Sequence, residues 1–349
     1  MTFYQELQLN QEGSKNVVRE ARGKKEKCKH MAIYLFKVLL TSVFCIAFVF
    51  LFAQIFGAEN SIAGVVVLLC VMAFRFADLG IRTAEAMWVF PILFGILAFG
   101  PKLANSGNLF TELLVNSVCI LALLVLGCHN VIMFNHSTLL LGYLLLYGYD
   151  VTGSAYFKRL AGLAAGAAVI MIIYYRNHRK KAYRRGLKDL LREFQFSSTR
   201  TQWQIKMMLG ISTVIFLLGL FQFPRRMWAG IAVMSITMPF QGDLYKRVKG
   251  RIFGSVAGGL LFIPFYYILP ESMRAYIGVM SGIVLGFCST YGFQTICNAF
   301  AAMSIAVAGL GFGPAVLFRV VNNVIGAVYG LILTKFSCYI SSNSASSRS

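Results

Sequence analysis

Acidic side chains are scarce in this chain. Only 13 of its 349 residues are Asp or Glu, against 33 Lys or Arg, which gives a net charge of +20 at neutral pH. Charged residues make up 13% of the sequence, about half of the share in a soluble domain, whereas 58% of the residues are hydrophobic. The mean hydropathy is +0.68. This composition excludes an ordinary soluble protein and indicates a polytopic membrane protein.

Motifs for hydrolysis, phosphoryl transfer and redox chemistry are also absent. The chain contains no G-x-x-x-x-G-K-[ST] phosphate loop, so we expect no ATP hydrolysis and no enzyme. Eight cysteines lie mostly inside apolar runs and form no C-x-x-C pair, which favours free thiols. The four histidines have no metal-ligand spacing. A site made of Cys128, His129 and His136 is the minority alternative, and the prediction is no metal and no cofactor.

Apolar runs fill the rest of the chain and predict an all-α integral membrane protein. We expect about twelve transmembrane helices, with ten as the lower limit. Two runs are short, and the fifth is interrupted by Asn135 and His136. The runs are 31–56, 61–74, 84–100, 109–128, 131–149, 155–175, 205–223, 227–241, 250–269, 274–290, 292–311 and 314–337.

Basic residues gather in caps between these runs rather than on one face. With twelve spans, 23 Lys and Arg lie on one side of the membrane and seven on the other, and the positive-inside rule places the larger set in the cytoplasm. That side holds a basic N-terminal tail (1–30), a basic linker (176–204) and a disordered C-terminal tail (339–349). We therefore expect contact with anionic lipid headgroups and no nucleic-acid binding. The predicted location is the plasma membrane, in a bacterium, with both termini cytoplasmic.

Within the linker, residues 179–192 are expected to form a basic amphipathic helix on the membrane surface.

The two apolar halves, 31–175 and 205–338, resemble each other. Asp78 and Arg82 in the first half have counterparts in Asp243 and Arg247 in the second, and other blocks keep the same order. Six spans in each half would give both halves the same orientation, so we predict two parallel six-helix repeats.

The stretch from Trp228 to Gly259 carries the most distinctive pattern. Trp228-Ala229 opens an apolar run, Pro239 follows near its end, and then comes Arg247-x-x-Gly250-x-x-x-Gly254. This pattern resembles the fusaric acid resistance protein-like (FUSC) or aromatic acid exporter superfamily, also called the integral membrane bound transporter domain. The resemblance implies efflux of aromatic carboxylic acids and related compounds, and distant plant relatives conduct malate.

Glu85 and Arg82 are candidates for an ion or substrate pathway. Glu85 is expected about three residues inside the third span, one turn after Arg82. Charged residues inside spans are costly and often mark proton relays, so Glu85 could couple proton entry to export. The alternative, which we favour, is an ion pair with Arg82 near the cytoplasmic headgroups.

Other polar residues extend this candidate set. Arg82 and Arg247 could attract an organic anion to the cytoplasmic mouth, or serve only as positive-inside anchors. Asp78 and Asp243 would be i,i+4 partners of these arginines if the segments are helical. Asn135 and Asn298 occupy matching spans, which favours a place near the central axis. Gly250, Gly254 and Gly258 lie four residues apart and predict close helix packing.

Together these patterns predict a multi-pass transporter that exports aromatic organic acids, or related small molecules, with the proton gradient. The alternatives are a passive organic-anion channel and a non-transporting membrane scaffold. The expected partners are a small organic anion and anionic lipid headgroups, and a homo-oligomer is compatible with the sequence.

Overall fold

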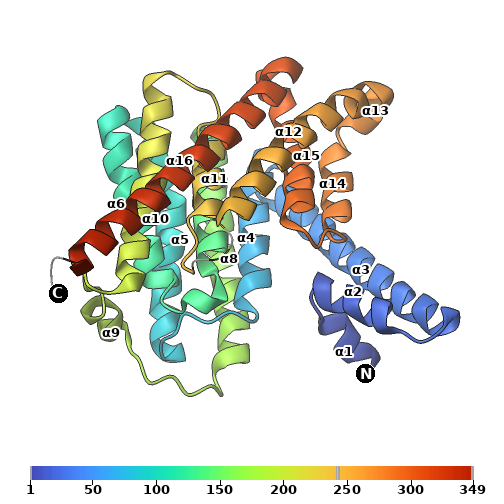
Figure 1. The fold of residues 1–349 in the computed structure, drawn as a ribbon, viewed down its shortest axis with the longest axis horizontal. Coiled ribbons are helices and arrows are strands. Elements are labelled where there is room, and N and C mark those ends of the chain that lie inside the picture. The colour runs from blue at the N-terminus through green and yellow to red at the C-terminus, as the bar shows by residue number, and fades with distance from the viewer. Residues whose placement is uncertain (1, 241, 243, 347–349) are drawn as a thin grey trace. The chain divides into compact units, whose positions relative to one another are not determined.

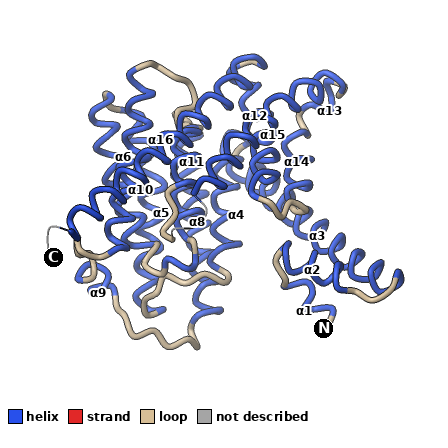
Figure 2. Tube along the Cα trace, viewed as in Figure 1, coloured by secondary structure: helices blue, strands red, loops and turns tan. Residues whose placement is uncertain are grey.

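The protein is all-helical throughout the part that the computed structural model describes. These residues are 2–240, 242 and 244–346, with side chains to residue 337. Figure 2 shows helices joined by loops, with no strand among them. The helices run α1 (Phe3–Gln8), α2 (Gln11–Glu20), α3 (Lys24–Phe56), η1 (Ala58–Asn60), α4 (Ser61–Phe74), α5 (Thr83–Ser106), α6 (Leu109–Gly127), η2 (Val131–Met133), α7 (Asn135–Gly148), α8 (Gly153–His178), α9 (Leu187–Arg192), α10 (Thr199–Leu220), α11 (Met227–Ile236), α12 (Leu244–Ile268), α13 (Glu271–Arg274), α14 (Ile277–Leu285), α15 (Tyr291–Leu310) and α16 (Phe312–Ser346) (Figure 1). The all-α prediction is confirmed.

Eight of these helices are long and apolar enough to cross a membrane: α3, α5, α6, α8, α10, α12, α15 and α16. The other four predicted spans correspond to α4, α7, α11 and α14, which have 14, 14, 10 and 9 residues. At 1.5 Å per residue these helices reach about 14–21 Å, less than the hydrocarbon thickness of about 30 Å. A multi-pass helical protein is therefore supported, and the count of twelve spans stays a prediction.

Local backbone chemistry explains why some apolar runs give short helices. Helix α11 ends at Ile236, and Pro239 follows three residues later, where the residue before a proline disfavours helical geometry. Helix α7 begins only at Asn135, because Phe134 before it has a left-handed backbone with φ of 54°. The polar interruption noted in the sequence thus lies at the start of α7.

The chain divides into two compact units, which do not follow the predicted halves. One unit comprises residues 1–48 and 249–321, and the other comprises residues 49–248 and 322–349. Each therefore combines parts of the 31–175 half with parts of the 205–338 half. The parallel six-helix repeat stays a prediction.

In the first unit, glycines on α12 bring that helix close to α15. A β-carbon at Gly254 would lie 2.7 Å from the Gly292 carbonyl oxygen, and one at Gly258 would lie 2.8 Å from Ala299 Cβ. At Gly250 the nearest atom is Tyr291 Cδ1, at 3.2 Å. Small residues four apart thus lie at the helix contact, where packing rather than water exclusion holds spans together. The adjoining core is Phe262, Ile277, Ala299 and Met303.

The basic N-terminal segment of the same unit is folded onto α3. His30 Nδ1 lies 2.9 Å from Glu6 Oε2, and the Lys37 ammonium donates to the Leu9 carbonyl oxygen at 3.1 Å and to the Ser14 hydroxyl. Residues 1–30 thus contain α1, α2 and the start of α3. At the other end of the chain, α16 continues to Ser346, past the predicted start of the C-terminal tail at 339.

In the second unit, α11 is buried over most of its surface, and only Ile231 and Ser235, one turn apart, are half-buried. Trp228 is 1% exposed, and Ala229 and Ala232 are fully buried. A helix that is apolar around most of its circumference belongs in an interior. Helices α7 and α10 pack against it, and small residues leave room for a close approach by α16. The short α11 is therefore held mainly by packing against its neighbours.

Candidate anion-binding pocket

A polar cavity lies in the second unit where three loops meet the start of α10. Its volume is about 430 Å³. The α4–α5 loop contributes Asp78, the α6–η2 loop contributes His129, and the linker contributes a run that ends in two arginines. The full lining is Asp78, Gly80, His129, Asn130, Ala182, Tyr183, Arg184, Arg185 and Arg200. Three arginines and one acidic residue are thus among the residues that line this cavity.

Asp78 ties the loops of this cavity together. Its Oδ1 accepts hydrogen bonds from the Gly80 amide at 2.9 Å and from Asn130 Nδ2 at 3.1 Å. Gly80 has φ of 75°, which favours glycine, and a β-carbon there would lie 3.2 Å from the His129 ring. Asn135 Nδ2 donates to the Asp78 carbonyl oxygen at 2.8 Å and to the Gly127 carbonyl oxygen at 2.9 Å. The structure therefore brings the predicted residues Asp78 and Asn135 together, and their hydrogen bonds hold the loops around the cavity.

Glu85 and Arg82 fasten the linker beside the cavity. The Leu187 amide, at the start of α9, donates to the Glu85 carboxylate. The Arg82 amide donates to the Arg185 carbonyl oxygen at 2.9 Å. Arg82 Nη1 lies 3.6 Å from Glu85 Oε1, which is the ion pair that the sequence favoured. In this geometry Glu85 orients the linker next to the arginines.

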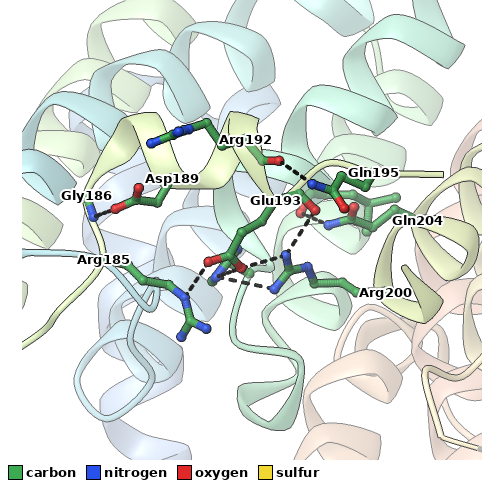
Figure 3. A network of polar contacts seen from close by, with 10 residues as sticks. Arg185, Gly186, Asp189, Arg192, Glu193, Gln195, Arg200 and Gln204 are labelled. Carbon is green, nitrogen blue, oxygen red and sulfur yellow. Dashed lines mark hydrogen bonds and ion pairs between the residues drawn. The ribbon is translucent and has the colours of Figure 1, made fainter. Parts of the chain in front are cut away.

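Glu193 is the centre of the charge network (Figure 3). Its carboxylate lies 2.7 Å from Arg185 Nε, 3.0 Å from Arg200 Nη2 and 3.3 Å from His129 Nε2. Burial raises the pKa of Glu193, but hydrogen bonds from the two arginines outweigh it and hold that pKa below its ordinary value. A carboxylate of the chain itself thus occupies a site made of two guanidinium groups and an imidazole.

His129 is held neutral at this site. Burial, followed by the charge of Arg200, lowers the pKa of His129 from 6.5 to about 4, against the opposing effect of Glu193. Arg185 adds to the lowering, and Asp189 opposes it. A neutral imidazole at Nε2 can accept the hydrogen bond from Arg200 Nη1, 3.3 Å away.

Acidification from pH 7 to pH 5 is expected to detach α9 and Glu193 from the pocket more often. Burial lowers the pKa of His129 by more than Glu193 raises it, so a detached state in which water reaches the imidazole binds a proton more readily, and the stabilisation is lost as pH falls from 6.5 towards 4. The lowered pKa of Glu193 acts in the same direction at still lower pH. Hydrogen exchange of the α9 amides, corrected for intrinsic rates, should accelerate on the order of tenfold.

His129→Gln is the control, because it should remove the change between pH 7 and pH 5. Stronger protection of α9 at pH 5 than at pH 7 would contradict the assignment.

The remaining predicted residues lie elsewhere. Arg247 is in the first turn of α12, where its Nη1 donates to the Ser235 carbonyl oxygen at 3.4 Å. Asn298 belongs to the other unit, is exposed on α15, and accepts at its carbonyl oxygen from Arg319 Nη2 at 3.4 Å. Asp243 lies outside the described residues.

Two helical predictions for segments near the cavity are wrong. Asp78 and Arg82 are not i,i+4 partners, because residues 75–82 form a loop in which the Asp78 side chain binds the Gly80 amide instead. The linker helix is also shorter than predicted: residues 179–186 are not helical, and α9 covers only Leu187–Arg192. The interrupted helix leaves Arg184 and Arg185 on an irregular segment that lines the cavity.

Sequence reasoning missed most of the residues that line the cavity. Tyr183, Arg184, Arg185 and Arg200 were counted only as part of a basic or polar segment. A usable signal was Glu193, one of two acids among ten cations in residues 176–206. An acid retained in such a segment is expected to have a cationic partner.

Residues 211–333 match the family described as fusaric acid resistance protein-like, which confirms the resemblance predicted from the sequence. The matched segment begins within α10 and ends within α16. No curated protein and no solved structure matches the chain. The match and the eight apolar helices support a multi-pass membrane protein with a transport or efflux role. The cavity residues, from Asp78 to Arg200, precede the matched segment, so the match assigns them no role.

Proposed function

We propose that this chain, with its fusaric acid resistance protein-like domain, is a twelve-span transporter that exports small organic acids, aromatic ones among them, from the cytoplasm. The proton gradient drives the export. The linker and both termini are cytoplasmic, the host membrane is the bacterial plasma membrane, and anionic headgroups bind the basic segments. The observation that carries the proposal is the convergence of Arg184, Arg185 and Arg200 on one cavity.

The cavity suits a carboxylate. Arg184 is exposed and makes no ion pair with any residue that the structure describes, so its guanidinium can meet a ligand. Arg185 and Arg200 already hold the Glu193 carboxylate, and this contact supports the proposal that the same guanidinium groups can bind the carboxylate of an organic acid. Guanidinium–carboxylate bonds are charge-assisted and directional, and the surrounding positive charge concentrates anions at the mouth.

The test is transport by the full chain in proteoliposomes. Counterflow and pH-jump uptake of a panel of aromatic carboxylates should be saturable in the wild type. Arg184→Ala should raise the half-saturating concentration by about tenfold, the loss of roughly one charge-assisted contact at a partly solvated site. Arg192→Ala is the matched control, because it removes the same charge from the same segment outside the cavity, where its side chain extends away from Glu193 (Figure 3).

The outcomes separate the competing functions. Conductance that follows the anion gradient without saturating would favour a passive channel. If folded protein transports no anion, the proposed transport function is wrong and a membrane scaffold is the remaining function. Saturable flux in which Arg184→Ala and Arg192→Ala behave alike would remove the cavity from the pathway.

A further inference from the structure

A second charged cluster lies at the opposite end of α6 from His129. Glu112 is in the first turn of that helix, about 22 Å along its axis from Gly127. It is only 5% exposed, inside an otherwise apolar bundle. Acids at such places are costly, and they persist where they are paired or where they carry ions or protons.

Two partners hold the Glu112 carboxylate. Arg226 Nη1, from the residue that precedes α11, lies 3.0 Å from Glu112 Oε2. The hydroxyl of Tyr147, a buried residue on α7, donates to Glu112 Oε1. The carboxylate therefore has one counter-charge and one neutral donor.

A second polar layer lies one helical turn deeper. Asn116 is fully buried, and its Oδ1 accepts from the hydroxyl of Tyr143 at 2.8 Å. Asn116 Nδ2 has no hydrogen-bond partner among the described residues. Two polar layers thus lie between α6 and α7, one of Glu112 and Tyr147 and one of Asn116 and Tyr143. We call these four residues the polar file.

A cavity adjoins one end of this file. A cavity of about 570 Å³ is lined by Asn105 and Asn108 at the α5–α6 turn, and by Glu112 and Arg226. Beyond Asn116, the next layers between α6 and α7 consist of Ile120, Leu123, Leu139 and Leu140, all fully buried. The apolar layers close the file towards the end of α6 at which the arginine pocket lies.

We propose that Glu112 is the proton-binding carboxylate of the transporter, loaded from the outer side through this cavity. The inference rests on the proposed export function and on its orientation. A proton from cavity water adds to a carboxylate oxygen of Glu112, and Arg226 is then left free to turn to solvent. Tyr147, Tyr143 and Cys119, whose thiol lies beside the Tyr143 hydroxyl, are the other titratable groups facing the file. In any one conformation, an alternating-access exporter opens its coupling site to only one side of the membrane.

The first test separates exchange from coupled transport. Glu112→Gln keeps the size and hydrogen bonding of the protonated side chain. Counterflow, which exchanges labelled for unlabelled acid without a pH gradient, should stay within about twofold of wild type, whereas accumulation driven by a pH gradient should be lost. Glu59→Gln is the control, because Glu59 is an exposed acid of the same unit and lines neither cavity.

The second test does not depend on a substrate. Dicyclohexylcarbodiimide adds to protonated carboxyl groups in apolar surroundings, and the modified peptide gains the mass of the reagent. Mass spectrometry should find the adduct at Glu112, with more at pH 5.5 than at pH 8. Glu112→Gln should abolish the adduct, because it removes the carboxyl group that the reagent modifies.

The outcomes distinguish this inference from the export function itself. If the wild-type protein transports no anion, the export function is wrong. The carbodiimide labelling then decides by itself whether Glu112 binds protons. Unchanged pH-driven accumulation in Glu112→Gln would overturn the coupling role. Loss of counterflow as well, in folded protein, would also overturn it and assign Glu112 to structure or substrate. Absence of the adduct between pH 5.5 and 8 would overturn proton binding.

Discussion

Replacing Trp228 by alanine is expected to lower the free energy of unfolding by about 3–5 kcal/mol. The indole is 1% exposed and lies on α11, a helix of 10 residues. Helix α11 is too short to be held by the thickness of the bilayer, so contacts with its neighbours must keep it in place. In lipid, packing supplies most of the attraction between helices, and a cavity of indole size removes many contacts at once.

Trp88→Ala is the matched control for this change. Trp88 is also helical, on α5, but its side chain is 75% exposed. Its loss should change the free energy of unfolding by no more than about 0.5 kcal/mol. Thermal unfolding of both variants in one detergent, with the fraction of monodisperse protein by size exclusion, measures the difference. Equal shifts in the two variants would contradict the interior position of α11.

The apolar runs predicted the helices of this fold well, because each helix places its own backbone hydrogen bonds within the run. What they could not predict is helix length. The run 227–241 gives only α11, because Pro239 disfavours helical geometry before it. The run 131–149 gives a helix only from Asn135, since Phe134 adopts a left-handed conformation. Both endings depend on local backbone chemistry that hydropathy does not record.

The candidate pocket was less predictable, because its contacts join segments far apart in the chain. The positive charge of the linker was evident, and so was an Arg82–Glu85 pair. The partner of Glu85 is the Leu187 amide, 102 residues away, and that of Asp78 is Asn130, 52 residues away. The comparison of the two halves instead paired Asp78 with Arg82. Such an i,i+4 pair requires a helix, and residues 75–82 form a loop.

Glycine spacing was informative about helix contacts without naming the partner helix. Gly326 and Gly330 of α16 lie four residues apart, which is the spacing typical of a close helix contact. The partner is α11: Gly326 faces Ala229 and Ala232, and Gly330 faces Ile236. The contact joins the last long helix to the buried helix that carries Trp228.

Replacing Gly326 by alanine is therefore expected to be the most damaging single-methyl change in this unit. The new β-carbon would lie 2.4 Å from the Ala229 carbonyl oxygen and 2.9 Å from Ala229 Cα. Both are backbone atoms of a largely buried helix, so neither can move without shifting α11 or α16. Overpacking of this kind costs about 1–3 kcal/mol or more, and we expect the upper end of that range.

Two further glycines of α16 turn this expectation into a graded series. Gly330→Ala places its methyl group 3.2 Å from Ile236 Cβ, which calls for a small adjustment and an intermediate loss. Gly313→Ala meets no atom within 4 Å and lies in the first turn of α16, where the helix-propensity gain of alanine is smaller than in a helix interior, so this variant should be close to neutral. The thermal midpoint should therefore be highest for Gly313→Ala, intermediate for Gly330→Ala and lowest for Gly326→Ala. If Gly326→Ala were as stable as Gly313→Ala, α16 could not lie on the backbone of α11, because the gain in helix propensity at Gly326, about 1 kcal/mol at most, cannot offset a backbone overlap.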